Sequence, residues 1–165
     1  MDFTTNFKTE LNQAQQFEQR TKEIYESLGF TVEIMPDNSP ERKFWDLKIT
    51  KNNKSQFIEV KYDQMAAIGR DDKSPTGNLY FEFESRGQKS GLETTKADLL
   101  IYWISPKFYI IFNNIPRLKR ELRNLPLVSG GDENSSYGKL LSLKSLPNYL
   151  GAYDDVEKCY QVVIL

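Results

Sequence analysis

An aspartate, a glutamate and a lysine stand in a short part of this sequence where two paired strands would hold them together. Asp46 lies in FWDLKIT (44–50), and Glu59 and Lys61 lie in QFIEVKY (56–62). Side chains alternate across a strand, so Glu59 and Lys61 share one face. The polar, asparagine-rich segment KNNKS between the two runs is typical of a hairpin turn. The hairpin would bring Asp46 beside Glu59.

The same alternation predicts an apolar face on the other side of this hairpin. We expect that face to carry Trp45, Leu47, Ile49, Ile58, Val60 and Tyr62. The hairpin would therefore bury one face and present the carboxylates and Lys61 on the other.

Two carboxylates on adjacent strands repel each other unless a cation lies between them. Mg²⁺ accepts one or two protein carboxylates and fills its other positions with water and substrate phosphate. Lys61 could orient or deprotonate an attacking water, or neutralise charge that develops on phosphate oxygens. The alternative is that Glu59 and Lys61 simply form a solvated polar face, because a Glu-x-Lys pattern is common on exposed strands.

The composition excludes several classes of enzyme. The chain has no histidine, which excludes Ser-His-Asp hydrolases, Cys-His proteases, HNH-type nucleases and most zinc enzymes. Its single cysteine, Cys159, excludes an internal disulfide and a cysteine-rich zinc site. Hydrolytic chemistry in this chain would have to use carboxylates, lysine and a hard metal ion.

The length and polarity indicate one soluble domain. The chain has 165 residues, of which 27% are charged and 13% aromatic, so we expect a single domain over 1–165 with a substantial core. It contains no run of about twenty apolar residues and no basic leader followed by an apolar stretch, so we expect a cytoplasmic protein without a membrane partner.

Residues 5–28 are expected to form a long first helix that ends at Gly29. Glu18 falls inside its apolar arc, beside Leu11 and Tyr25. A buried carboxylate is costly without a partner. Glu18 is therefore either an edge residue that reaches water or a further ligand for a metal or water, provided that the helix crosses the hairpin.

The remaining elements predict an α/β (α+β) fold with a mixed sheet and a second helix. The second helix is expected at 115–124, and the least ordered segment at 128–137. A short helix or turn is expected within 139–150. Further strands are expected at 30–35, 79–85, 97–104, 107–112 and 159–165. The exposed edge of the last strand could be covered by a second subunit.

Asp46 and Glu59-Val60-Lys61, preceded by a helix and Gly29-Phe30, resemble the PD-(D/E)XK nuclease superfamily. The likeness is greatest to its Holliday-junction-resolvase-like and phage-encoded endonuclease branches. Glu18 stands eleven residues before Gly29, as the helical glutamate of that pattern does. The resemblance covers residues 14–62 well and 78–112 loosely, and Trp45 replaces the proline of the motif's name.

The resemblance implies a restriction-endonuclease-like core and hydrolysis of DNA with Mg²⁺ or Mn²⁺. Asp46, Glu59 and the backbone carbonyl of Val60 would bind the metal. Lys61 would act on the water or the transition state, and Glu18 would assist. A resolvase-like enzyme would also be a homodimer with two sites.

Several basic residues are candidates for contact with nucleic acid. Arg42 and Lys43 precede the hairpin, and a second basic group precedes the strand at 97–104: Arg86, Lys89 and Lys96. Phosphate contact is one interpretation of both groups. A solvated, solubilising charged surface is the other.

Two non-enzymatic functions stay open. The first is a nucleic-acid-binding or assembly protein that retains the nuclease fold without its chemistry. The second is a structural interaction domain with a merely solvated acidic face, which would leave Glu18 unexplained. The preferred substrate is not encoded in the carboxylates, because loops and subunit spacing set specificity.

Overall fold

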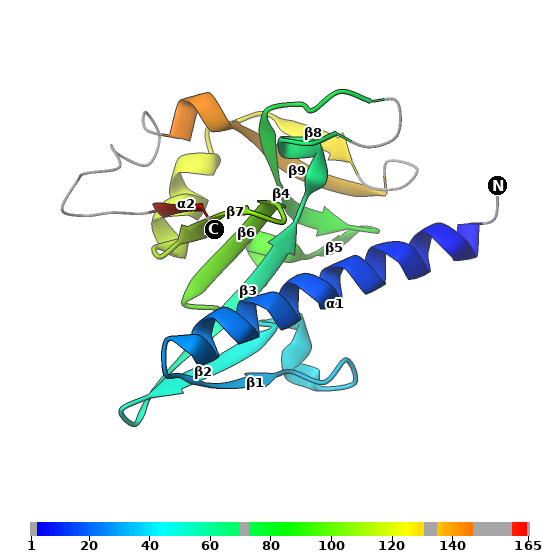
Figure 1. Ribbon diagram of the computed structural model, residues 1–165. Helices are drawn as coiled ribbons and strands as arrows, with labels where there is room; N and C mark the ends of the chain where they lie inside the picture. The colour runs from blue at the N-terminus through cyan, green and yellow to red at the C-terminus, as the bar shows by residue number, and fades with distance from the viewer. Residues whose placement is uncertain (1–2, 70–72, 131–134, 147–159, 165) are drawn as a thin grey trace.

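The computed structural model of the chain describes residues 3–69, 73–130, 135–146 and 160–164. Within them the fold is α+β, with a six-stranded mixed sheet, a four-stranded antiparallel sheet and two α-helices (Figure 1). The expected mixed central sheet with a long N-terminal helix and a second helix is confirmed at this level.

Short 3₁₀ helices lie between several of the strands. The α-helices are α1 (Phe3–Ser27) and α2 (Ile115–Leu122). The strands are β1 (Thr31–Ile34), β2 (Leu47–Lys51), β3 (Lys54–Tyr62), β4 (Asn78–Ser85), β5 (Gln88–Lys89), β6 (Leu99–Ser105), β7 (Phe108–Phe112), β8 (Leu127–Gly130), β9 (Ser136–Ser142) and β10 (Tyr160–Ile164).

The central sheet has the strand order β1-β2-β3-β6-β7-β10. Its β3 and β6 strands are parallel, with Ile58 opposite Leu99, and the other neighbours are antiparallel. The β2–β3 turn places Asn52 and Asn53 at φ 51° and 60°, the left-handed region that asparagine tolerates. The predicted hairpin therefore forms with the turn chemistry that its sequence indicated.

Helix α1 packs on one face of this sheet because its apolar stripe meets buried strand residues. The Phe17 ring stacks on Tyr62 with 4.0 Å between ring centroids. The indole Nε1 of Trp103 donates a hydrogen bond to Thr21 Oγ1 at 2.9 Å, in a fully buried position. These contacts hold the helix over β3. Glu18 lies between the two contact residues, Phe17 and Thr21, in the same helix.

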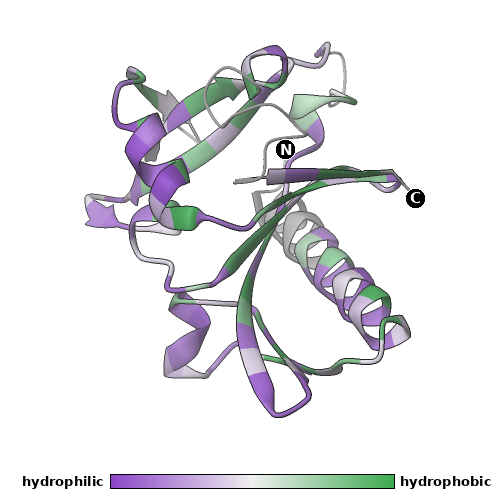
Figure 2. Ribbon diagram, turned by 90° about the vertical axis from the view of Figure 1, so that its left-hand side faces the viewer, coloured by the Kyte–Doolittle hydropathy of each residue, from purple (hydrophilic) through white to green (hydrophobic). Residues whose placement is uncertain are grey.

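The opposite face of the central sheet is covered by α2 and the second sheet. Leu118 and Leu122 of α2 join one core cluster with Ile110, Phe112 and Phe81. Figure 2 shows apolar residues along the middle of the central strands and polar residues at the tip of the β2–β3 hairpin. The two faces thus enclose two cores separated by the central sheet.

The second sheet was not predicted, and it corrects two expectations. Its order is β5-β4-β9-β8, so the strand expected at 79–85 pairs with β9 instead of joining the central sheet. Residues 128–130 and 136–137, expected to lack order, belong to β8 and β9. The helix or turn expected from 139 begins only at Leu143, as a 3₁₀ helix, and 147–150 lie outside the described residues. The β4–β9 ladder provides backbone partners that the local sequence does not reveal.

Trp45 also departs from the predicted alternation. Strand β2 begins at Leu47, so residues 44–46 are not held in the strand's pleat. The Trp45 ring packs on Phe57, 4.2 Å away between centroids, and belongs to the core on the side away from α1. Leu47 and Ile49 face α1 as predicted.

The last strand of the chain is confirmed in its described part. Strand β10 pairs with β7 at one end of the central sheet. Within the part of the chain that the structure describes, no helix combines the length and the apolar character needed to cross a membrane.

Candidate active site

The two predicted carboxylates come together at the start of β2. Leu47, its first residue, is paired with Ile58, and Asp46 precedes Leu47 as Glu59 follows Ile58. The Asp46 backbone N–H donates to the Ile58 carbonyl at 2.8 Å, and Asp46 Oδ2 accepts from the Val60 N–H at 2.7 Å. The Asp46 carboxylate therefore accepts the Val60 N–H of β3 in place of a backbone carbonyl of the neighbouring strand.

A single cavity of about 780 Å³ brings the predicted catalytic residues together. Its walls include Glu18, Asp46, Glu59, Val60 and Lys61. The second sheet supplies the facing wall, with Tyr80, Glu82, Arg86 and Ser136 among its residues. The acidic hairpin thus opens into a space between the two sheets, large enough for a small ligand or a segment of a polymer.

Glu18 is buried rather than extended to water. Its exposed fraction is 5%, so the interpretation of an edge residue that reaches solvent is wrong. Helix α1 carries it across the start of β2, as the helical stripe predicted. Its compensating partner is a cation from the loop between β1 and β2.

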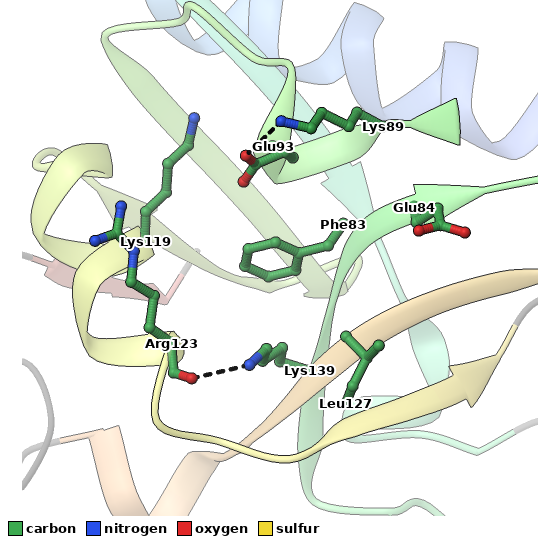
Figure 3. Close-up of a pocket in the computed structure, with 8 residues that line it drawn as sticks. All are labelled: Phe83, Glu84, Lys89, Glu93, Lys119, Arg123, Leu127 and Lys139. Atoms are coloured by element: carbon green, nitrogen blue, oxygen red, sulfur yellow. Dashed lines mark hydrogen bonds and ion pairs between the residues drawn. The ribbon is translucent and has the colours of Figure 1, made fainter. Parts of the chain in front are cut away.

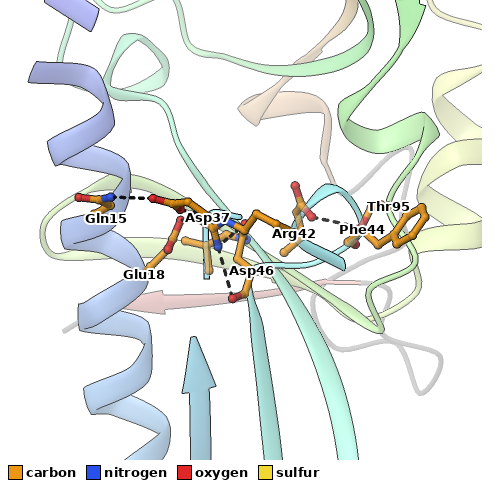
Figure 4. Close-up of polar contacts among 9 residues, drawn as sticks. Gln15, Glu18, Asp37, Arg42, Phe44, Asp46 and Thr95 are labelled. Carbon is orange, nitrogen blue, oxygen red and sulfur yellow. Dashed lines mark hydrogen bonds and ion pairs between the residues drawn. The ribbon is translucent and has the colours of Figure 1, made fainter. Parts of the chain in front are cut away.

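That cation is Arg42, whose guanidinium lies among three carboxylates (Figure 4). Its Nη2 is 2.5 Å from Glu18 Oε1, and its Nη1 is 2.9 Å from Asp46 Oδ1. Asp37 lies 3.5 Å from Nε. The exposed fractions of the Arg42, Glu18 and Asp46 side chains are 19%, 7% and 12%, so the pairing is shielded from water. Of the two carboxylates that were expected to share a metal, Asp46 pairs with Arg42, and no ion pair with Glu59 is among the contacts of Arg42 in the described part of the chain.

A short 3₁₀ helix, Pro40–Lys43, aims Arg42 at the site. Pro40 stands in its first turn, and the Ser39 hydroxyl caps it by accepting a hydrogen bond from the Glu41 N–H at 3.2 Å. Arg42 was predicted only as a contact for nucleic acid, so its role between Glu18 and Asp46 was missed. The Ser39-Pro40-Glu41 start of a helical turn, which precedes Arg42 four residues before Asp46, was the available signal.

Glu59 is the most strongly perturbed of the three site carboxyls. Burial, and then the charge of Asp46, raise its pKa to about 8, while Lys61 acts in the opposite direction. The Thr95 hydroxyl lies 3.3 Å from Glu59 Oε2 and 2.9 Å from the Phe44 carbonyl. A protonated Glu59 can donate to Thr95 while Thr95 donates to Phe44, so the local hydrogen bonds accommodate the neutral acid.

The pKa values of the other two carboxyl groups, those of Asp46 and Glu18, are also raised. Burial raises the pKa of Asp46, against the Val60 N–H and the charge of Arg42. Burial likewise raises the pKa of Glu18, against its hydrogen bond from Arg42. All three groups therefore hold protons more tightly in the folded chain than in the unfolded chain.

We expect the metal-free protein to lose stability as pH rises from about 5 to about 8. Between the ordinary pKa of 4.5 and about 8 the folded state retains the Glu59 proton that the unfolded state has lost, so the free energy of unfolding falls as pH rises. Urea unfolding in EDTA at several pH values measures this slope. Glu59→Gln should make it shallower, and an equal slope in parent and variant would contradict the assignment.

The other predicted basic residues are distributed around the site. Arg86 lines the cavity. Lys43 and Lys96 lie 4.9 Å and 3.9 Å from the centre of the Phe44 ring, outside the cavity lining. Lys89 lines a separate cavity and pairs with Glu93 at 3.6 Å. Contact of any of them with nucleic acid stays a prediction.

A bulge in β4 decides which of its glutamates faces the site. Glu82 is paired with Gly138 and Glu84 with Tyr137, so the register shifts between them. Glu82 lines the active-site cavity, whereas Glu84 lines the cavity that contains Lys89. Regular alternation would have placed both on one face.

The donor set fits a magnesium site with few protein ligands better than a closed metal cage. No cluster of three or more Asp, Glu, Cys or His side chains spaced to hold a metal occurs among the described residues. Asp46 and Glu59 still provide two facing carboxylates, and Mg²⁺ commonly binds one or two and completes its shell with water and phosphate. A metal ion would have to replace Arg42 at Asp46 Oδ1.

Comparison with known sequences adds no assignment. Neither the protein-family models nor the curated protein sequences contain a match to this chain.

Proposed function

We propose that the chain is a metal-dependent endonuclease that hydrolyses phosphodiester bonds in DNA on a restriction-endonuclease-like core. The observation that carries the proposal is the shared cavity of Asp46, Glu59 and Lys61, in which a buried and a half-buried carboxylate from the two strands of a hairpin come together. Selectivity for branched DNA such as a Holliday junction is the finer expectation from the resemblance.

Asp46, Glu59 and the Val60 carbonyl would hold Mg²⁺ or Mn²⁺. When bound, such an ion polarises the phosphate and lowers the pKa of a coordinated water. Glu59 must release its proton to become a ligand, so metal affinity should rise with pH towards about 8. Asp46 must release Arg42, while its Oδ2 keeps the Val60 N–H and stays oriented.

Lys61 is available for the reaction. It shares the strand face of Glu59 and lines the cavity, and within the described part of the chain its ammonium has no ion pair and no side-chain hydrogen bond. It can therefore stabilise charge on the phosphate oxygens or orient the attacking water without breaking an internal contact. Glu18 would assist from α1 by holding the Arg42 guanidinium while Asp46 and Glu59 hold the metal.

A non-catalytic nucleic-acid-binding or assembly protein is the second candidate. The observation that favours it is the Arg42 pairing, which compensates Glu18 and Asp46 without any metal. A homodimer would suit either function. Strand β10 at the end of the central sheet offers the edge to which a second copy would add.

Cleavage of a mixed panel of nucleic acids tests the proposal. The panel contains linear duplex, supercoiled circle, single-stranded DNA, a four-way junction and RNA, each with Mg²⁺, Mn²⁺ or EDTA. We expect metal-dependent cutting of DNA that Lys61→Ala loses by about 100-fold or more. Lys54→Ala, at the exposed start of the same strand, is the matched control and should cut like the parent.

Three other results would count against this function. Cutting in EDTA would show that the reaction needs no metal ion. Equal cutting by Lys61→Ala and the parent would show that the reaction does not need Lys61. Retention of DNA without cleavage of any panel member would favour the non-catalytic candidate.

A further inference from the structure

A second cavity, of about 570 Å³, lies beside β4 (Figure 3). Glu82 and Phe83 are consecutive in β4, and Glu82 lines the active-site cavity while Phe83 lines this one. Four basic side chains line its walls around the Phe83 ring, namely Lys89, Lys119, Arg123 and Lys139. Two carboxylates, those of Glu84 and Glu93, also line it, which leaves an excess of positive charge.

Lys119 and Arg123 are the cations that remain free to bind a ligand. They are four residues apart in and directly after α2, which places them on one side of the helix. Neither has a side-chain hydrogen bond or an ion pair among the residues that the structure describes. Lys139 is already engaged, because its Nζ donates to the Arg123 and Leu125 carbonyls at 3.0 Å and 2.6 Å.

The other charged residues of the cavity do not occupy Lys119 or Arg123. Lys89 is 78% exposed and its ion pair with Glu93 spans 3.6 Å, so that pair is weak and can open. An arginine offers a planar fork of donors and a lysine a compact charge, and together they suit the tetrahedral oxygens of a phosphate.

We propose that Lys119 and Arg123 form a phosphate-binding site that holds the nucleic-acid backbone away from the reacting bond. The inference rests on the proposed function, since it names a second contact for the same polymer. The β4–β5 turn connects the two cavities, because Arg86 lines the first and Lys89, three residues later, lines the second. Arg86 and Lys89 thus place a cation in each cavity on either side of this turn, along the edge formed by the two-residue strand β5.

DNA binding in EDTA tests the site without cleavage. Fluorescence anisotropy with a labelled duplex and a labelled four-way junction is measured over a series of salt concentrations. Lys119→Gln/Arg123→Gln should weaken binding about tenfold or more and reduce the slope of log affinity against log salt by about 2. Arg120→Gln/Lys144→Gln removes the same charge from exposed positions outside the cavity lining, and should change the affinity by less than about threefold.

Equal losses in the two double variants, or no loss in either, would overturn the proposal. Pyrophosphate is titrated as a probe against the same proteins. Binding of pyrophosphate that depends on Lys119 and Arg123, without an effect of these residues on DNA, would assign the cavity to a small free anion and also overturn it.

The outcome is separable from that of the nuclease proposal. DNA binding that needs Lys119 and Arg123, in a protein that cuts no DNA with Mg²⁺ or Mn²⁺, would support the phosphate site and reject the nuclease. Metal-dependent cutting of DNA, with DNA binding that does not depend on Lys119 and Arg123, would support the nuclease and reject the phosphate site.

Discussion

Asp46→Asn and Glu59→Gln are each expected to reduce metal-dependent DNA cleavage by about 1,000-fold. Each variant keeps the size of the side chain and loses the negative charge that would hold the ion and, through it, the developing charge of the transition state. Cleavage rates of the preferred panel substrate, measured in single turnover with excess protein, report this loss directly.

Stability separates a catalytic role of these carboxylates from a structural one. Glu59→Gln should unfold at equal or higher urea concentration at pH 8, because it removes a buried charge whose pKa is raised to about 8. Glu33→Gln makes the same change on exposed β1 and serves as the control. Cleavage by Asp46→Asn or Glu59→Gln at a rate close to that of the parent would reject the active-site assignment.

Arg42→Gln is expected to lower the free energy of unfolding in EDTA by about 3 kcal/mol, since removing one partner of a shielded ion pair leaves uncompensated buried charge. Glu18 and Asp46 can partly respond by taking up protons, because burial already raises the pKa of each. The loss should therefore be larger at pH 8 than at pH 6. Urea unfolding at both pH values measures it.

Metal ions should compensate for the missing guanidinium. We expect Mn²⁺ or Mg²⁺ to raise the unfolding midpoint of Arg42→Gln more than that of the parent, because Asp46 Oδ1 no longer has an internal cation. Glu18→Gln/Arg42→Gln should recover part of the lost stability, since it removes one of the unpaired carboxylates. An equal metal response in the parent and in Arg42→Gln would show that the ion does not replace Arg42, and would weaken the metal-site proposal.

Arg42 gives the candidate site its electrostatic character. The guanidinium joins Glu18 on α1 to Asp46 at the start of β2, and so it holds the helix and the hairpin together. Its contacts with Glu18 and Asp37 would remain if Asp46 held a metal ion instead. Contact of Arg42 with nucleic acid stays a prediction.

The local pattern of the sequence was sufficient for the hairpin. Alternation in 44–50 and 56–62, with asparagines between them, predicted the β2–β3 pair and the opposition of Asp46 and Glu59. Trp45 was misplaced, because the strand begins two residues later than the pattern suggested. Strand boundaries depend on which backbone groups find partners, and a single strand's sequence does not contain that information.

The second sheet could not be predicted from local sequence patterns. Strands β4 and β9 are more than fifty residues apart in the sequence, and the glycines and serines near β8 and β9 weaken their alternation. The bulge that separates Glu82 from Glu84 arises from that distant pairing. As a result, the wall of the active-site cavity that faces the carboxylates could not be predicted.

Residue types and strand geometry were enough to predict the acidic hairpin. The absence of histidine, with carboxylates and a lysine at period-two spacing, was enough to propose a chemistry for it. The burial of Glu18, the pairing of Arg42 with Glu18 and Asp46, and the wall that the second sheet adds to the cavity are visible only in the folded chain. Such contacts join residues distant in the chain, and their energies depend on the burial that the whole fold creates.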